Sequence, residues 1–370
     1  MPHDPYKALY IHLPFCKHRC AYCDFTTRAI APDSVEIDEY IDNLILELRR
    51  KAKEGELSEI ETVYLGGGTP SFVGQARLSK LLYALGVSMN LTPEVECSME
   101  ANPDSLTPEL IRDIYALGVN RLSIGVQSFD DGLLKTLDRI HDSARAKQAV
   151  LDARERFENV SVDLMCGVPG QTPEMFEADV QTAVDLGVTH VSVYPLTIED
   201  HTPFRSMVDS GEIDDVDQDK EALMMSMAPN VLTPAGFHRY EVASYAREGF
   251  ECKHNIAYWT GVPYLGLGIS AVTMTQNDAR RMRVQDGEVQ DDLNRKQMCA
   301  EDLMMKMRMT RGVSDDELFA AAVIIPGALD VFNSLVRDKL VKREDGRWKP
   351  TFGGWLLGNE LYGRIYELAP

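Results

Sequence analysis

Three cysteines stand close together near the start of the chain, in the segment YIHLPFCKHRCAYCDF. Cys16, Cys20 and Cys23 form a C-x3-C-x2-C pattern directly after an apolar run. A cubane iron–sulfur cluster is held by thiolates and normally takes four of them. With only three thiolates, one iron stays open to a small molecule, and the cluster can act as a reagent and not only as an electron carrier. The spacing therefore predicts a cluster with chemistry at its fourth iron.

The alternatives for this loop are a zinc site or three core thiols. Structural zinc usually has a second C-x2-C pair downstream, which the sequence lacks, although His18 inside the loop could serve as a zinc ligand. The other cysteines occur singly, and we interpret Cys97, Cys166, Cys252 and Cys299 as packing residues. The spacing of the three loop cysteines favours the cluster.

Other residues suited to ligand binding follow predicted strands. The loop Gly66–Ser71 (GGGTPS) comes directly after the run VYL, and its glycines, Gly67 and Gly68 among them, would let the backbone approach a ligand before Thr69. Glu100 and Gln127 follow two further strands, and Arg139 and Asp163 extend this polar group. Asp163 lies within the apolar run SVDLMCGVP, where an unpaired carboxylate would be costly. It needs a partner, for which a cofactor hydroxyl is one candidate.

A second notable string is HNIAYW, which contains His254, Asn255, Tyr258 and Trp259. An imidazole beside two aromatic side chains offers a metal ligand and a flat apolar surface, as haem binding would require. The alternative is a core histidine with aromatic neighbours, and the string alone favours that alternative. Methionine-rich runs at 224–227 and 304–309 have helical spacing, and we interpret them as core filling.

A regular scaffold must position these residues, and the pattern from Ala8 to about Leu196 predicts one. The predicted strands are Ala8–Leu13, Thr62–Leu65, Val95–Met99, Arg121–Gly125, Ser161–Met165 and His190–Tyr194. The predicted helices are Tyr40–Arg50, Arg77–Ser88, Pro108–Leu117, Ala144–Arg156 and Pro173–Leu186. Six βα repeats predict an α/β fold, and we favour a partial (β/α)6 barrel over an open doubly wound sheet. Because such barrels build their sites at the carboxyl ends of the strands, the polar residues are expected to meet in one pocket.

The repeating pattern stops after Asp200. An acidic linker, Glu212–Lys220, leads into a predicted helix, Glu221–Leu232, and a strand-like run, HRYEVASYA, precedes the HNIAYW string. From about Leu293, helices and a hairpin with an EDG turn predict a small α+β domain of winged-helix type. We therefore predict a core at 1–235, a connecting region at 236–292 and a C-terminal domain at 293–370. This last domain has no basic recognition face, which favours a packing role over DNA binding.

The composition excludes some functions. The 370 residues are 44% hydrophobic and 26% charged, as in soluble globular proteins, and the formal net charge is −20. So acidic a chain is not expected to bind nucleic acid, and the basic string LRRKAK at 48–53 is interpreted as a solvated helix face. Neither a membrane span nor a secretory leader is recognised, and the seven cysteines argue against a disulfide framework. We expect a cytoplasmic protein.

Four strings together carry a family resemblance: YIHLPFC, GGGTPS, RLSIGVQSF and HNxxYW. The chain resembles the HemN/HemW branch of the radical S-adenosylmethionine superfamily through most of its length. The resemblance implies that Cys16, Cys20 and Cys23 bind a [4Fe–4S] cluster whose open iron is chelated by S-adenosylmethionine. It implies a site for that cofactor lined by Tyr10, Gly67, Gly68, Thr69, Glu100, Gln127, Arg139 and Asp163. It assigns a haem region to His254, Asn255, Tyr258 and Trp259.

Two functions occur in this branch: oxygen-independent coproporphyrinogen III oxidase and haem chaperone. The oxidase pattern has another cysteine two places after the third, where this chain has Phe25 after Asp24, and a longer segment before its cluster loop. Together with the HNxxYW string, these departures favour a haem chaperone that is not an enzyme. The expected partners are haem and acceptor haemoproteins, with a homodimer and peripheral contact with membrane haemoproteins as further candidates.

Overall fold

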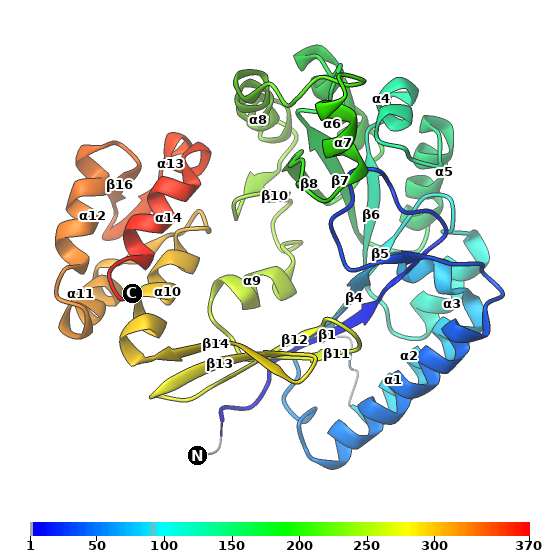
Figure 1. Cartoon of the computed structure of the whole chain (residues 1–370), viewed down its shortest axis with the longest axis horizontal. Helices are drawn as coiled ribbons and strands as arrows, with labels where there is room; N and C mark the ends of the chain where they lie inside the picture. The colour runs from blue at the N-terminus through cyan, green and yellow to red at the C-terminus, as the bar shows by residue number, and fades with distance from the viewer. Residues whose placement is uncertain (1–2, 90–91, 93) are drawn as a thin grey trace.

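The computed structural model describes residues 3–89, 92 and 94–370, and is built around one sheet (Figure 1). Six parallel strands form its centre in the order β1, β4, β5, β6, β7, β8. Their bounds are β1 Ala8–Leu13, β4 Thr62–Gly67, β5 Glu96–Ala101, β6 Arg121–Gln127, β7 Asn159–Cys166 and β8 His190–Pro195. The predicted α/β partial barrel of six βα units is confirmed.

Helices follow the strands and cover the outer face of this curved sheet (Figure 1). They are α1 Val35–Lys53, α2 Gln75–Ser88, α3 Pro108–Ala116, α4 Asp131–Thr136, α5 Ser143–Arg154, α6 Pro173–Asp185, α7 Pro203–Asp209 and α8 Gln218–Leu232, with a short 3-10 turn at Pro70–Val73. Side-chain oxygens cap the first turns of all these helices except α2, as Ser34 does for α1 and Thr107 for α3. Because of its cap, α1 begins five residues before the predicted Tyr40.

Strands outside the six repeats extend both edges of the sheet. β11 (Tyr264–Leu267) pairs in parallel with β1 and is followed by an antiparallel meander of β12 Val272–Gln276, β13 Arg280–Gln285 and β14 Glu288–Asn294. At the other edge, HRYEVASYA forms two short strands, β9 (His238–Arg239) and β10 (Ser244–Ala246), instead of one. Arg239 causes the break, because its guanidinium bonds the carbonyl oxygens of Glu241 and Val242 and holds the intervening chain in a bend.

The C-terminal segment folds around its own core. Its elements are α10 Arg295–Lys306, β15 Val313–Ser314, α11 Asp315–Ile324, α12 Ala328–Arg337, β16 Val341–Glu344, β17 Arg347–Pro350, α13 Phe352–Leu356 and α14 Gly358–Tyr366. The predicted EDG turn joins β16 to β17, with Asp345 and Gly346 both at positive φ. Among the residues that the structure describes, no helix combines the length and apolar character needed to cross a bilayer.

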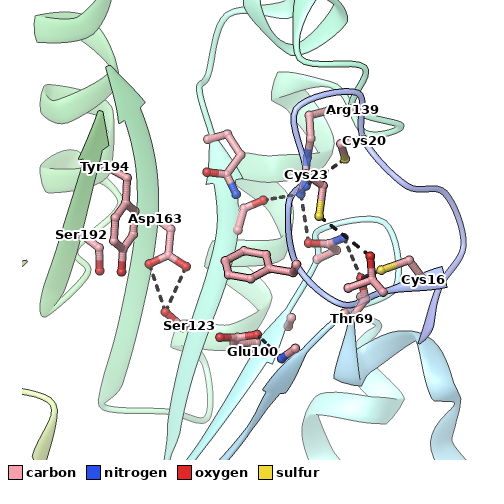
Figure 2. A pocket seen from close by; sticks show the side chains of 18 of the residues that line it. Cys16, Cys20, Cys23, Thr69, Glu100, Ser123, Arg139, Asp163, Ser192 and Tyr194 are labelled. Carbon is pink, nitrogen blue, oxygen red and sulfur yellow. Dashed lines mark hydrogen bonds between the residues drawn. The ribbon is translucent and has the colours of Figure 1, made fainter. Parts of the chain in front are cut away.

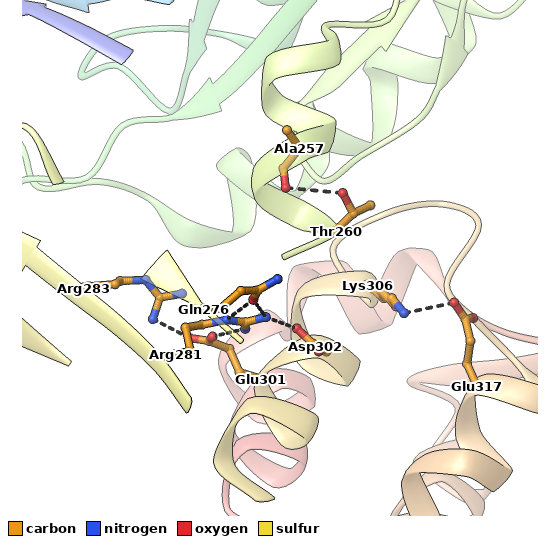
Figure 3. Close-up of polar contacts among 9 residues, drawn as sticks. All are labelled: Ala257, Thr260, Gln276, Arg281, Arg283, Glu301, Asp302, Lys306 and Glu317. Atoms are coloured by element: carbon orange, nitrogen blue, oxygen red, sulfur yellow. Dashed lines mark hydrogen bonds and ion pairs between the residues drawn. The ribbon is translucent and has the colours of Figure 1, made fainter. Parts of the chain in front are cut away.

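A buried ionic network joins this C-terminal unit to the sheet (Figure 3). Arg281 on β13 donates to Glu301 (2.5 Å) and Asp302 (2.7 Å) on α10, and Arg283 donates to the other oxygen of Glu301 (2.8 Å). The Arg281 side chain is only 2% exposed, and Gln276 accepts two further hydrogen bonds from it. Such a group is stable in the interior only with its partners, so the network fixes where α10 sits on the sheet.

Candidate cofactor site

The three predicted cluster ligands lie together beyond the carboxyl end of β1: Cys16 ends β2 (Phe15–Cys16), and Cys20 and Cys23 lie in the loop between β2 and β3 (Arg28–Ala29). All three line one cavity of about 330 Å³, which Figure 2 shows from close by. Thr69 donates a hydrogen bond to the Cys16 sulfur at 3.4 Å, and Arg139 donates to the Cys20 sulfur at 3.5 Å. Donors aimed at sulfur are suited to thiolates that carry negative charge.

The donor set fits a cubane cluster with one open iron. No other cysteine lines the cavity within the described part of the chain, so three thiolates are the sulfur ligands on offer there. Burial raises the pKa of the Cys16 and Cys20 thiols, so their thiolates are costly unless a bound metal supplies a compensating positive charge. Cys97, Cys166 and Cys252 are buried elsewhere, and Cys299 lies on α10.

The glycine loop lies against the cysteine loop at very close range. A Cβ atom on Gly67, whose φ is +112°, would lie 2.5 Å from the His12 ring. One on Gly68 would lie 2.7 Å from the Phe15 carbonyl oxygen. Both positions therefore require glycine, and the resulting approach places the GGGTPS backbone beside the three sulfurs.

Glu100 projects into the cavity from the carboxyl end of β5. Its carboxylate accepts hydrogen bonds from the Tyr64 hydroxyl and from the Gly67 N–H, both at 3.0 Å. Burial, and then the nearby charge of Asp163, raise the pKa of Glu100 to about 7, although the two hydrogen bonds oppose the shift. Glu100 therefore changes charge close to neutral pH.

Gln127 and Arg139 line the cavity beyond Glu100. Gln127 has a left-handed backbone (φ 69°) where the register of β6 against β7 shifts, which turns its side chain into the cavity. Arg139 is held by hydrogen bonds to the Asn102 side chain (2.9 Å) and the Gly125 carbonyl oxygen (2.7 Å). The other terminal nitrogen of Arg139 donates to the Cys20 sulfur, so the guanidinium brings a positive charge to the cluster loop.

Asp163, which the sequence left in need of a partner, obtains one from the protein itself. The Ser123 hydroxyl lies 3.1 Å from both of its carboxylate oxygens (Figure 2). Burial still raises the pKa of Asp163, although Arg121 and the neighbouring serine hydroxyls oppose the shift. Of the residues expected around S-adenosylmethionine, Tyr10 alone does not line the cavity; its ring stacks on Tyr64 and its hydroxyl bonds His12 at 2.9 Å.

The HNxxYW string forms α9 (Lys253–Trp259), which lies across the amino-terminal ends of the barrel strands. Glu96, the first residue of β5, caps this helix by accepting hydrogen bonds from the N–H groups of Lys253 (2.9 Å) and His254 (3.1 Å). Thr62, the first residue of β4, bonds His254 Nδ1 at 2.9 Å. The helix thus closes the barrel at the end opposite the cysteine loop.

The four residues of this string face different surroundings. His254 is 1% exposed, and its Nε2 bonds the Tyr258 hydroxyl at 3.2 Å, so both ring nitrogens are occupied. Trp259 packs under the Arg308 guanidinium of the C-terminal unit, 4.8 Å from the ring centre. Only Asn255 lines the cavity. As arranged here, His254 does not fit the role of a haem iron ligand, and its contacts favour a structural role.

Several cavity residues were not singled out from the sequence: Tyr64, Arg121, Ser123, Ser192 and Tyr194. Four of them lie in strands at alternate positions, Arg121 and Ser123 in RLSIGVQ and Ser192 and Tyr194 in HVSVYP. Polar residues at every second position of an otherwise apolar strand are the signal that would have found them, since alternate residues face the same side of a sheet.

Comparison with known proteins agrees with this geometry. The model of the Radical SAM superfamily matches residues 10–183. The protein of Bacillus subtilis (strain 168) named Heme chaperone HemW is 33% identical over 96% of this chain and 98% of its own length. The chain belongs to the HemW family. A Mycobacterium tuberculosis (strain H37Rv) protein of the same name is 35% identical, covering 94% of this chain and 93% of that protein.

A solved structure confirms the fold of this HemW-family chain. Coproporphyrinogen III oxidase (HemN) from Escherichia coli superposes with a TM-score of 0.80, covering 98% of this chain and 90% of that one. At 20% identity this likeness concerns the fold alone. Membership of the radical SAM superfamily implies a [4Fe–4S] cluster and S-adenosylmethionine as cofactors, in agreement with the three-thiolate loop.

Proposed function

We propose that this protein is a haem chaperone that binds haem and delivers it to acceptor haemoproteins. The observation that carries the proposal is the match along almost the whole chain to relatives named Heme chaperone HemW. We further propose that it acts in the cytoplasm. The proposal includes two further candidates: a homodimer of this chain, and peripheral contact with membrane haemoproteins.

The cofactor site supports this function through residues with separate tasks. Cys16, Cys20 and Cys23 would hold the cluster, which in this superfamily supplies an electron for reductive cleavage of S-adenosylmethionine. The backbone at Gly67, Gly68 and Thr69, with Glu100, Gln127, Arg139 and Asp163, would orient the nucleotide. Tyr10 would support it from behind, through the Tyr64 ring on which it stacks. In a chaperone, S-adenosylmethionine need not be cleaved at this site. Binding of the cluster and S-adenosylmethionine would instead signal that the protein has its cofactors.

Oxygen-independent coproporphyrinogen III oxidase is the second candidate, because the HemN structure shares the fold. The cluster loop of this chain differs from the oxidase pattern at Asp24 and Phe25. The position two places after the third cysteine is Phe25, which lines the cavity and offers an apolar ring in place of a thiol. The absence of a thiol at Phe25 favours the chaperone.

An anaerobic assay separates the two functions. The reconstituted protein is offered coproporphyrinogen and haem in separate reactions with S-adenosylmethionine and a reductant. A chaperone takes up haem, transfers it to an apo-haemoprotein and releases no carbon dioxide. Release of carbon dioxide with formation of protoporphyrinogen, and no haem uptake, would establish the oxidase instead.

Replacement of His254 by alanine should leave haem stoichiometry unchanged. The change removes the bonds to Thr62 and Tyr258 and opens a gap beneath the barrel, so we expect a loss of about 2–4 kcal/mol in the free energy of unfolding. Haem titration and urea unfolding provide the two measurements. The exposed His201 is the matched control, because His201→Ala loses only a surface ion pair. Loss of haem from folded His254→Ala, with His201→Ala unaffected, would make His254 a ligand.

The affinity for S-adenosylmethionine should depend on pH through Glu100. Its pKa of about 7 means that the carboxylate, the form able to accept hydrogen bonds at both oxygens, is lost as the pH falls below 7. If only this form binds, the affinity falls by up to about tenfold for each pH unit below 7 and levels off above it. Calorimetric titrations between pH 6 and 8.5 provide the test, and Glu100→Gln should bind weakly without this dependence. The same slope in Glu100→Gln would assign the titration to another group.

A further inference from the structure

One wall of the cavity is not used by the residues proposed to hold S-adenosylmethionine. Arg121, Ser192, Tyr194 and Asn255 line it, from β6, β8 and α9. In Figure 2, Ser192 and Tyr194 lie beyond Asp163 as seen from the three cysteines. Arg121 is the first residue of β6 and Asn255 lies in the helix that closes the barrel, so this wall reaches the inner end of the cavity.

Arg121 is the unusual member of this wall. Its residue is only 2% exposed, yet the buried Nε has no hydrogen-bond partner among the described residues. Burial lowers the pKa of Arg121, but the nearby Cys252, Glu96, Tyr64 and Tyr240 raise it overall. Arg121 in turn lowers the pKa of Glu100 and Asp163 through space. Because taking a guanidinium out of water costs several kcal/mol, a buried arginine normally has an acceptor in direct contact.

The nearby carboxylates are already engaged with other donors. Glu96 accepts hydrogen bonds from the backbone of α9, and Glu100 accepts from Tyr64 and Gly67. Asp163 accepts from Ser123. Among the described residues, the Nε atom of Arg121 is therefore left without an acceptor, and the Asn255 side chain on the same wall offers a further donor.

We propose that Arg121 and Asn255 form a carboxylate subsite at the inner end of the cavity, which receives a propionate of haem. A carboxylate supplies a planar pair of acceptors that matches the guanidinium fork. The identity of the ligand rests on the proposed function, because haem carries two propionates.

The size of the cavity limits what enters it. The cavity has a volume of about 330 Å³, at the low end for small-molecule sites, and S-adenosylmethionine is proposed to take part of it, so there is room in it for a propionate arm but not for the haem macrocycle. Phe25, which lines the cavity and is 70% exposed, offers an apolar surface at that mouth. On this assignment, the HNxxYW string contacts haem through Asn255, and His254 holds α9 in place.

The test is a two-by-two comparison of haem and haem dimethyl ester, in which both propionates are esterified, on the wild type and on Arg121→Gln. In wild type, the ester should bind about tenfold to a hundredfold more weakly than haem, the range expected for losing a charge-assisted hydrogen bond. Arg121→Gln should lose a similar factor for haem and little further for the ester. Arg154→Gln on the outer helix α5, where Arg154 bonds the Glu158 carbonyl oxygen, is the control and should bind both ligands as wild type does.

The outcomes are distinct. Equal affinity of wild type for haem and its ester overturns the subsite, and so does an Arg121→Gln protein that loses the same factor for both ligands. Failure of wild type to bind haem overturns the proposed function itself, and the subsite with it. The ester comparison on wild type needs no variant, so it decides the matter even if Arg121→Gln does not fold; Arg121→Lys, which keeps the charge but not the fork, should then bind haem with an intermediate affinity.

Discussion

Replacing Cys20 by serine is expected to abolish cluster assembly. Two thiolates do not hold a cubane, and a serine hydroxyl ionises too weakly at neutral pH to replace the third. Cys20 is half-buried in a surface loop, so the substitution should leave the fold intact. After anaerobic reconstitution, bound iron and acid-labile sulfide should fall to background, and affinity for S-adenosylmethionine should fall with them because the open iron is gone.

Cys299→Ser is the matched control for this experiment. Cys299 is also half-buried but lies on α10, outside the cavity, so iron and sulfide should remain at the wild-type level. Two results would contradict the assignment: wild-type iron content in Cys20→Ser, or zinc in place of iron and sulfide in the wild type. The second result would return the loop to the zinc alternative, with His18 as the additional ligand.

Replacing Arg281 by methionine should cost up to about 3–5 kcal/mol of unfolding free energy, because it leaves Asp302 without its counter-charge and the buried Glu301 with Arg283 as its one remaining partner in the network. Pairing with Arg283 and Arg281 outweighs burial and lowers the pKa of Glu301, so this part of the stability is present above the unfolded pKa and is lost as the pH falls through the folded one. Urea unfolding followed by tryptophan fluorescence is the measurement. It is well placed, since Trp348 and Trp355 lie in the C-terminal unit and Trp259 packs against it.

The control is the combined change Arg281→Met with Glu301→Met. Removing both charges takes away the under-compensated buried carboxylate, while Arg283 keeps its pair with Asp291, so the double variant should recover part of the lost stability. Arg280→Met, on the same strand but exposed and paired with Asp292 at the surface, should cost less than about 1 kcal/mol. If Arg281→Met were as mild as Arg280→Met, the network would not hold α10 on the sheet.

The sequence by itself determined the central fold and the ligand loop, because both depend on local patterns. Alternation of apolar strands and amphipathic helices has a period that can be read directly, and it predicted the six βα units. The cysteines Cys16, Cys20 and Cys23 lie within one short loop, so their spacing alone indicated a common ligand. The EDG turn was equally local, since a tight hairpin requires positive φ at two adjacent residues.

The meander β12–β14 was missed for a physical reason. The alternation of apolar residues is short in β12 (VTMTQ) and β13 (RRMRVQ) and absent from β14 (EVQDDLN), and the last two strands are rich in charged residues, so pairing with neighbours decides their structure. The tight turn at Asp286 and Gly287, both at positive φ, was the one local signal for it. The prediction of one continuous strand over HRYEVASYA was wrong for another reason. The Arg239 side chain bonds the backbone two and three residues later and bends the chain there.

Only the tertiary structure decided the roles within the HNxxYW string. Sequence alone cannot show that Thr62, nearly two hundred positions earlier, bonds one nitrogen of His254, or that Glu96 caps its helix. Nor can it show that Arg121 is buried beside that helix without a hydrogen-bond partner at Nε among the described residues. Motif recognition finds residue types that occur together along the chain, whereas burial and hydrogen bonding depend on strands brought together in space. For that reason the cluster ligands could be predicted from their spacing. The fold was needed to show that His254 is buried with both ring nitrogens bonded, whereas Asn255 lines the cavity.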